Sequence, residues 1–191
     1  LPENFDYGSI ENNIYRNKYF GFEIKVPAKW SVIDKEMQSR DREQSKKLFG
    51  EKYKEMVEKM PEDVQNASLL AINKYPRDSV FDDTYNPSLA MVAENIRRVG
   101  DISASQYLDQ TKKLMKQAGM DVDTPDAYGK TKIGGREFSV MPVTMRVQGY
   151  AVSQQYYVRI EKGFAFAIIV TYGYEAQQRE IDEILATAKF E

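Results

Sequence analysis

Residues 17–30 read NKYFGFEIKVPAKW, and their apolar side chains occupy every second position. Phe20, Phe22, Ile24 and Val26 therefore share one face, while the residues between them are small or charged. A period of two predicts a half-buried strand, and Pro27 is expected to end it. Residues 1–11 show no such period. They are expected to form an N-terminal arm or tether with partial disorder.

Helices and further strands follow, which predicts an α+β domain. A helix is expected from Ser103, where Gln106 completes a capping box, to Gly119, and a closing helix over 175–188. Apolar runs of strand length are joined by turn residues at 134–135, 149 and 162–163. The runs lie at 67–75, 88–98, 127–133, 136–148, 150–161 and 164–172.

Two strands of the last third carry special patterns. The run 164–172 is apolar on both faces, so it is expected to lie centrally with other layers covering each face. In 136–148 the apolar phase shifts near Pro142, which predicts a β-bulge there. The expected architecture is an αβα sandwich, with a central antiparallel sheet of about six to seven strands flanked by helices.

Composition excludes many kinds of site. The chain has 191 residues, which predicts one domain over 12–191. It contains no Cys and no His, so thiol nucleophiles, imidazole bases and the usual zinc sites are ruled out. A net charge of −2 makes nucleic acid a poor partner. No apolar run reaches the ~20 residues that a membrane span needs, and a lipid anchor upstream of residue 1 remains open.

Residues 35–63 form a highly charged segment that is expected to be a helical insert. An apolar stripe with helical spacing runs through it, and this stripe either packs on the sheet or binds a partner. The candidate partner-binding residues are Phe49, Tyr53, Met56 and Met60.

The loop after the run 67–75 is rich in oxygen ligands. Asp78, Asp82, Asp83 and Asn86 are the candidate ligand-binding residues, although their spacing fits no EF-hand and solvated loop acids are the simpler interpretation. Trp30 is the only Trp and is expected to be a mostly buried anchor, with ligand stacking as the alternative. The tyrosines at 150, 156, 157, 172 and 174 are either a binding face or ordinary strand residues.

The pattern N-x-x-F-G-F-x-I-x-x-P-x-x-W at residues 17–30 resembles the first strand of the Mog1/PsbP-like superfamily. The order of the later elements is similar over residues 12–190. The resemblance is nearest to PsbP-like domains of bacterial extracytoplasmic proteins, often lipoproteins. It implies their fold and an extracytoplasmic location. The known binding activities of the superfamily cannot be matched to residues here.

Three functions are compatible with these observations. The leading hypothesis is a non-enzymatic extracytoplasmic interaction or assembly domain with a protein partner and no cofactor. A carrier for a small molecule or metal ion, binding at the 78–86 loop, is the alternative. A carboxylate-based hydrolase is the third hypothesis, although no catalytic and no metal-binding residue is assigned.

Overall fold

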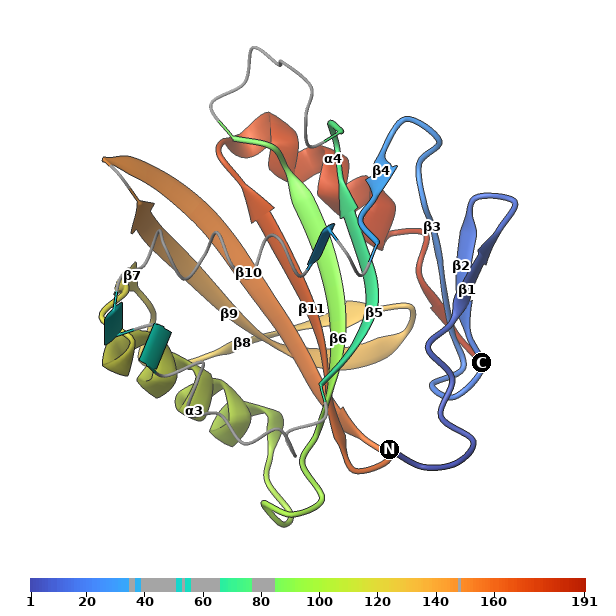
Figure 1. Ribbon diagram of the computed structural model, residues 1–191, viewed down its shortest axis with the longest axis horizontal. Helices are drawn as coiled ribbons and strands as arrows, with labels where there is room; N and C mark the ends of the chain where they lie inside the picture. The colour runs from blue at the N-terminus through green and yellow to red at the C-terminus, as the bar shows by residue number, and fades with distance from the viewer. Residues whose placement is uncertain (35–36, 39–50, 53, 56–65, 77–84, 148) are drawn as a thin grey trace.

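Two antiparallel sheets and the helices α3 and α4 make up most of the described chain (Figure 1). The computed structural model describes residues 1–34, 37–38, 51–52, 54–55, 66–76, 85–147 and 149–191. The four-stranded sheet has the order β1-β2-β3-β12: β1 (Ser9–Glu11), β2 (Ile14–Asn17), β3 (Phe22–Lys25) and β12 (Lys189–Phe190). The eight-stranded sheet has the order β4-β5-β6-β11-β10-β9-β7, and β8 pairs with β9.

Six of the eight strands of the large sheet agree closely with the predicted runs, and the two short strands β4 and β7 had no predicted run. The strands are β4 (Ser31–Val32), β5 (Asn66–Asn73), β6 (Ser88–Asn95), β7 (Asp121–Asp123), β8 (Gly129–Ile133), β9 (Arg136–Val147), β10 (Tyr150–Glu161) and β11 (Phe164–Tyr172). The two helices that lie wholly within the described residues are α3 (Ala104–Gln117) and α4 (Glu175–Leu185). Ser103 caps α3, and the predicted capping box with Gln106 is confirmed.

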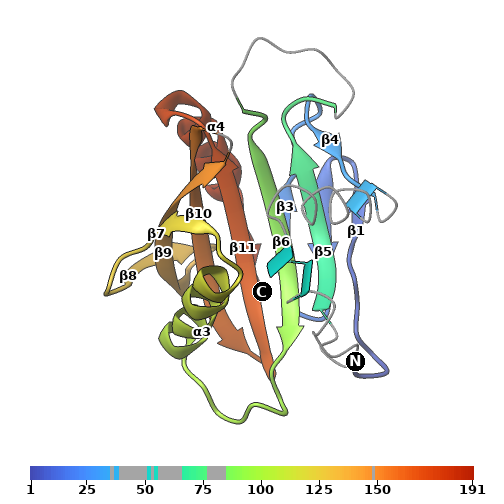
Figure 2. The same cartoon turned by 60° about the vertical axis from the view of Figure 1, so that its left-hand side comes forward.

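The α+β class and the antiparallel pairing are confirmed, but the predicted single sheet of about six to seven strands flanked by helices is wrong, because the strands divide into sheets of eight and four. α3 covers one face of the large sheet, and Figure 2 brings this helix to the front of the strands. The other face packs against α4 and the small sheet. The reason lies in the opening strand: the ring centroids of Phe22 and Phe166 are 5.5 Å apart, so β3 packs face to face on β11 rather than beside it.

The prediction for residues 164–172 is confirmed, because β11 lies in the middle of the large sheet between β6 and β10. Its two faces belong to different cores. Phe164, Phe166 and Ile168 pack toward the small sheet and α4, while Ala165 and Ala167 belong to the core under α3.

The predicted β-bulge at Pro142 is wrong. The pairing of β9 with β10 runs without a break, with Pro142 opposite Gln155. The phase of the apolar residues shifts because β9 buries one face near its start and the other face near its end. On its outer edge, β8 pairing reaches Val140 and β7 pairing starts at Thr144, so the proline lies between the two partner strands. The residues of the two buried faces are Phe138 and Val140, then Met141, Val143 and Met145.

Residues 1–11, the predicted arm, contribute to the fold. Asn12 and Asn13 have φ of 52° and 59° and connect β1 to β2 in a tight turn. Earlier in this segment, the ring of Phe5 lies 5.3 Å from that of Phe164 at the edge of the core. The segment 1–11 therefore includes the first strand of the small sheet, β1, as well as an aromatic contact to the core.

Candidate functional site

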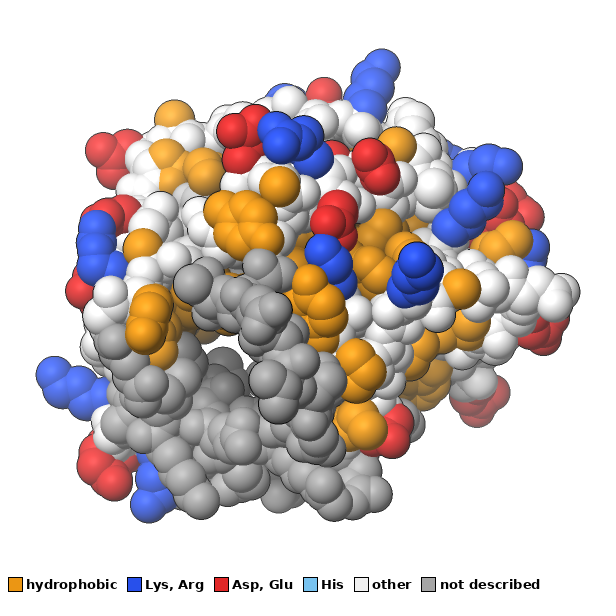
Figure 3. Space-filling model, turned by 90° about the horizontal axis from the view of Figure 1, so that it is seen from above, with side chains coloured by type: hydrophobic (Ala, Val, Ile, Leu, Met, Phe, Trp, Pro, Cys, Tyr) orange, Lys and Arg blue, Asp and Glu red, His pale blue; other side chains and the backbone are white. Residues whose placement is uncertain are grey.

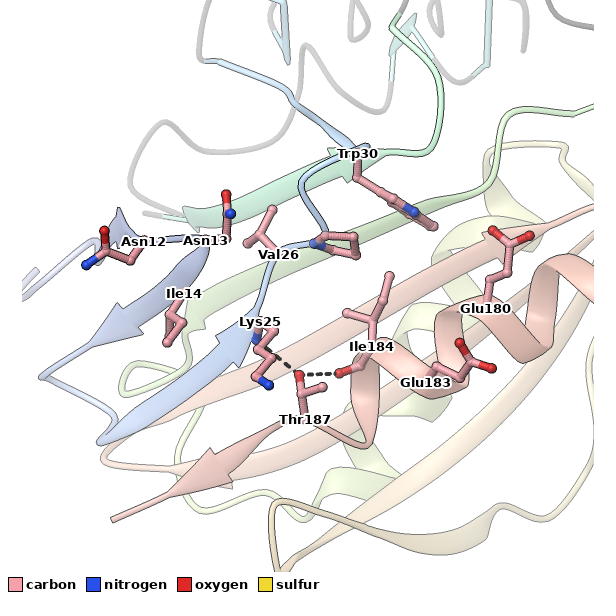
Figure 4. Close-up of a pocket in the computed structure, with 11 residues that line it drawn as sticks. Asn12, Asn13, Ile14, Lys25, Val26, Trp30, Glu180, Glu183, Ile184 and Thr187 are labelled. Carbon is pink, nitrogen blue, oxygen red and sulfur yellow. Dashed lines mark hydrogen bonds between the residues drawn. The ribbon is translucent and has the colours of Figure 1, made fainter.

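A groove of about 560 Å³ opens where the edge of the small sheet meets α4 (Figure 4). The turn between β1 and β2, the end of β3, the segment after Pro27, and α4 with the residues that follow it form the walls. At this end of the molecule, apolar side chains reach the surface among charged ones (Figure 3). The lining residues are Asn12, Asn13, Ile14, Lys25, Val26, Pro27, Trp30, Glu180, Glu183, Ile184 and Thr187.

Hydrogen bonds of the backbone fix one wall of the groove. The Val26 N–H donates to the Asn13 carbonyl at 2.8 Å, which ties the end of β3 to the turn between β1 and β2. The Trp30 N–H donates to the Pro27 carbonyl at 2.9 Å, and this short turn carries the indole toward α4. Trp30 was expected to be mostly buried. It is half-buried instead, because one part of its ring packs on the core while the other part lines the groove.

Thr187 joins the two walls at the end of α4. Its Oγ1 accepts a hydrogen bond from the Lys25 N–H at 3.0 Å and donates one to the Ile184 carbonyl at 2.7 Å. Ile184 is buried against the core, so the wall formed by α4 is anchored. The groove is thus held by contacts between segments that are more than 150 residues apart in the sequence.

Two glutamates of α4 line the groove and differ in their partners. Glu180 Oε1 lies 2.7 Å from Lys74 Nζ, and this hydrogen bond raises the pKa of Lys74. Glu183 is exposed and forms no ion pair with any residue that the structure describes. Figure 4 shows both carboxylates and the indole of Trp30 toward one end of the groove, with Asn12 and Asn13 at the other end.

A second cavity of about 470 Å³ lies on another side of α4, against the turn between β8 and β9. Burial raises the pKa of Asp182, which lines it. Tyr157 lines it too and donates a hydrogen bond to Gln155 Oε1 at 2.7 Å. Gln155 Nε2 donates in turn to the Tyr172 hydroxyl at 3.0 Å. The side chains of Tyr157, Gln155 and Tyr172 satisfy one another within the sheet, so these three leave little for a ligand.

Of the four predicted ligand-binding residues, Asn86 alone lies within the described residues. Asn86 uses its side-chain amide on the backbone of Tyr75: its Oδ1 accepts from the N–H at 3.0 Å, and its Nδ2 donates to the carbonyl at 2.9 Å. Asn86 therefore closes the base of the loop. Asp78, Asp82 and Asp83 lie outside the described residues, as do the partner-binding candidates Phe49, Tyr53, Met56 and Met60.

The tyrosines of the last strands do not form one exposed cluster. Tyr157 and Tyr172 are buried and Tyr156 is half-buried, which leaves only Tyr150 and Tyr174 of the five exposed. This arrangement favours their interpretation as strand residues.

Neither a metal-binding cluster nor a membrane-spanning helix is present among the described residues. No group of three or more acidic, His or Cys side chains there is arranged to hold a metal ion. No described helix is long and apolar enough to cross a membrane.

Sequence reasoning missed the groove as a site. Trp30 was the one residue in the sequence that pointed to the groove, because a lone Trp after a strand-ending proline can either pack on the core or stack on a ligand. The contribution of α4 had no local signal. Glu180 and Glu183 have the spacing of any solvated helix face, and only the tertiary fold brings them next to the end of β3.

No family model and no curated protein sequence matches the chain. Among solved structures, the chain is similar to cyanobacterial PsbP (CyanoP) from Synechocystis sp. PCC 6803, with a TM-score of 0.58 and 10% identity over 96% of this chain and 98% of that one. LpqN, involved in cell envelope biogenesis of Mycobacterium tuberculosis, matches with a TM-score of 0.44 and 12% identity over 88% and 82% of the two chains. A protein from Bacteroides thetaiotaomicron matches with a TM-score of 0.45 and 15% identity over 90% of this chain and 45% of that one.

The likeness to CyanoP covers almost the whole of both chains, and it extends through both sheets and both helices described above. An identity of 10% shows a shared fold and no more. The chain has the PsbP-like fold that the pattern of its opening strand predicts.

Proposed function

We propose that this chain is a non-enzymatic interaction domain that works outside the cytoplasm and docks a partner in the groove beside Trp30. The observation that carries the proposal is the half-buried indole on an apolar wall with charged residues at the rim. Aromatic anchors surrounded by a polar rim are typical of protein-binding surfaces. The extracytoplasmic location is the one that the resemblance to PsbP-like domains implies.

The groove offers little to acid–base catalysis. A general acid usually needs a carboxyl group whose pKa burial raises. Of the two groove carboxylates, Glu180 is paired with Lys74 at 2.7 Å. Asp182, whose pKa is raised, faces the other cavity. A screen against hydrolase substrates tests whether the chain is non-enzymatic. Turnover of a substrate that is abolished by replacing a single carboxylate would establish an enzyme.

Docking can be tested by photo-crosslinking in the native host. A benzophenone amino acid is placed at Lys25, which is exposed at the groove, and in a matched protein at Lys113, which is exposed on α3. The proposal expects one dominant protein adduct from position 25, absent from position 113, and lost when Trp30→Ala is added. Adducts of equal yield from both positions, or adducts that survive Trp30→Ala, would show that the groove is not the docking site.

A small-molecule or metal-ion carrier is the second candidate function, because the groove volume lies within the usual range of small-molecule sites. A thermal-shift panel with calcium, zinc, sugars and short peptides tests it. A ligand at a hundred times its Kd adds about 2.7 kcal/mol to the free energy of unfolding. An unchanged melting temperature across the panel would count against a carrier.

The apolar stripe of Phe49, Tyr53, Met56 and Met60 stays a second predicted partner surface. Replacing Tyr53 and Met56 with Asp should remove partner binding and leave the melting temperature nearly unchanged if the stripe docks a partner. Unfolding of the double variant would show instead that the stripe packs on the domain.

A further inference from the structure

The groove contains one carboxylate that has no counter-charge in the described structure. Lys74 neutralises Glu180 at 2.7 Å, whereas Glu183 has no partner among the described residues. The side chain of Glu183 lines the groove three residues after Glu180, which places both on one face of α4. A bound group that completes the charge balance of this rim would be a cation.

The wall opposite α4 is suited to the stem of a long cationic side chain. Val26 and Pro27 supply aliphatic surface, and the Trp30 indole points from this wall toward the end of the groove where the glutamates lie (Figure 4). Arginine and lysine bury their methylene stems along such surfaces and keep the charged head at the rim. The face of an indole is also the best aromatic partner for a cation.

We propose that the docked partner segment inserts an arginine or lysine side chain into this groove, with its stem along Val26 and Pro27 and its cationic head between Trp30 and Glu183. This inference rests on the proposed function, since it names the chemistry of the segment that the interaction domain binds. Charge complementarity with Glu183 is the argument for a basic segment.

Lys25 also lines the groove, and its charge sets the direction of the bound side chain. Its backbone N–H bonds to Thr187, which lies two residues beyond the end of α4 and follows Glu183 by four residues. Figure 4 shows the Lys25 side chain beside Thr187, away from the carboxylates of Glu180 and Glu183. Its ammonium therefore disfavours a cation near Thr187 and tolerates one near Trp30. Lys25→Gln should strengthen the binding of a basic segment by a small factor.

The emission of Trp30 measures this binding directly, because the chain has no other Trp. The probes are two blocked pentapeptides, Gly-Ser-Arg-Ser-Gly and the same peptide with citrulline, an uncharged analogue of arginine. We expect the arginine peptide to shift the emission with an affinity about tenfold higher than the citrulline peptide, as a cation–π contact and one ion pair together supply.

Two variants of α4 separate the groove carboxylate from the overall charge. Glu183→Gln should remove most of the difference between the two peptides. Asp182→Asn makes the same change of charge one residue away, on the side of the helix that faces the second cavity, and should keep the difference. Both positions are exposed, so both variants are expected to fold, and their melting temperatures check this.

Other results overturn the inference in distinct ways. Equal affinities for the two peptides, or no emission change with either, would exclude a basic side chain as the anchor while leaving the crosslinking test of the groove to decide the proposed function. An equal loss in Glu183→Gln and Asp182→Asn would reduce the effect to overall charge. A response to methylguanidinium as strong as that to the arginine peptide would assign the site to a small organic cation rather than to a protein segment.

Discussion

Replacing Asn17 with Ala tests whether the first residue of the N-x-x-F-G-F pattern has a structural role. Asn17 is 1% exposed, and its side chain makes three hydrogen bonds. Its Oδ1 accepts from the Phe20 N–H at 2.9 Å, and its Nδ2 donates to the Asp6 carbonyl at 2.8 Å and to the Tyr15 hydroxyl at 3.2 Å. One side chain therefore holds the turn between β2 and β3 and fixes the segment before β1.

The magnitude follows from what the substitution leaves unpaired. Phe20 is 2% exposed, so its N–H would lose its acceptor in a buried position. That costs about 1–3 kcal/mol, and losing the bond to Asp6 adds about 1 kcal/mol. The Tyr15 hydroxyl keeps its own bond to the Tyr7 carbonyl at 2.9 Å and adds little. The expected loss in the free energy of unfolding is about 2–4 kcal/mol.

Urea denaturation followed by circular dichroism measures this loss. With an m-value of about 2 kcal/mol per molar, the midpoint should fall by about 1–2 M. Asn95→Ala is the matched control, because Asn95 Oδ1 accepts from the Arg97 N–H at 3.2 Å in an exposed position. Its loss should stay below about 1 kcal/mol. Equal losses in the two variants, or a loss below about 0.5 kcal/mol for Asn17→Ala, would refute a buried structural role for Asn17.

Three further predictions concern packing, backbone and pH. Phe166→Ala should lower the free energy of unfolding by about 3–5 kcal/mol, because the ring is fully buried. Trp30→Ala should lower it by about 1–3 kcal/mol, because the indole is half-buried. Chemical denaturation of both variants should show the larger loss for Phe166→Ala. Gly134→Ala should destabilise more than Gly135→Ala in thermal unfolding, since both have positive φ but a Cβ at 134 meets backbone atoms of Lys189 and Ala188 at 3.1 and 3.2 Å. Burial and the Glu94 carboxylate raise the pKa of the Tyr107 hydroxyl far above its usual value, so the hydroxyl loses its proton at lower pH in the unfolded chain than in the folded one. The free energy of unfolding should therefore fall as the pH rises above about 10. Tyr107→Phe should make this fall shallower, as denaturation midpoints between about pH 8 and 11 would show.

Elements with strong local signals were predictable from the sequence. The capping box of Ser103 and Gln106 and the positive-φ turn at Gly134 and Gly135 depend on residues that are neighbours in the chain. The two apolar faces of β11 also carry their own information. A strand that is apolar on both sides has to lie between two layers, whichever elements form them.

Features that depend on distant segments were not predictable in the same way. A strand pattern does not say which sheet the strand joins, so β3 was expected in the central sheet and pairs instead with β2 and β12. The phase shift in β9 has two local explanations, a bulge or a change of buried face. The position of α3 relative to the small sheet decides between them.

The opening pattern and the groove depend on different residues of the same segment. Internal contacts bury the side chains of Asn17, Phe20 and Phe22. Gly21 has a φ of 61°, and its carbonyl accepts a hydrogen bond from the Glu191 N–H at 2.8 Å. These positions can persist in any protein of this fold, whatever it binds.

The residues that face a ligand lie beside those positions. Lys25 alternates with Ile24 and Val26 and faces outward, and Trp30 follows the strand. Glu183, the carboxylate at the rim of the groove, lies about 160 residues after Lys25 in the chain. A protein could keep the whole buried set and change the charges at positions 25 and 183 with little loss of stability, because neither side chain forms an ion pair with a described residue. Similarity in the pattern therefore carries information on the fold, and comparisons of function between proteins of this fold should be made on the residues at positions 25, 30 and 183.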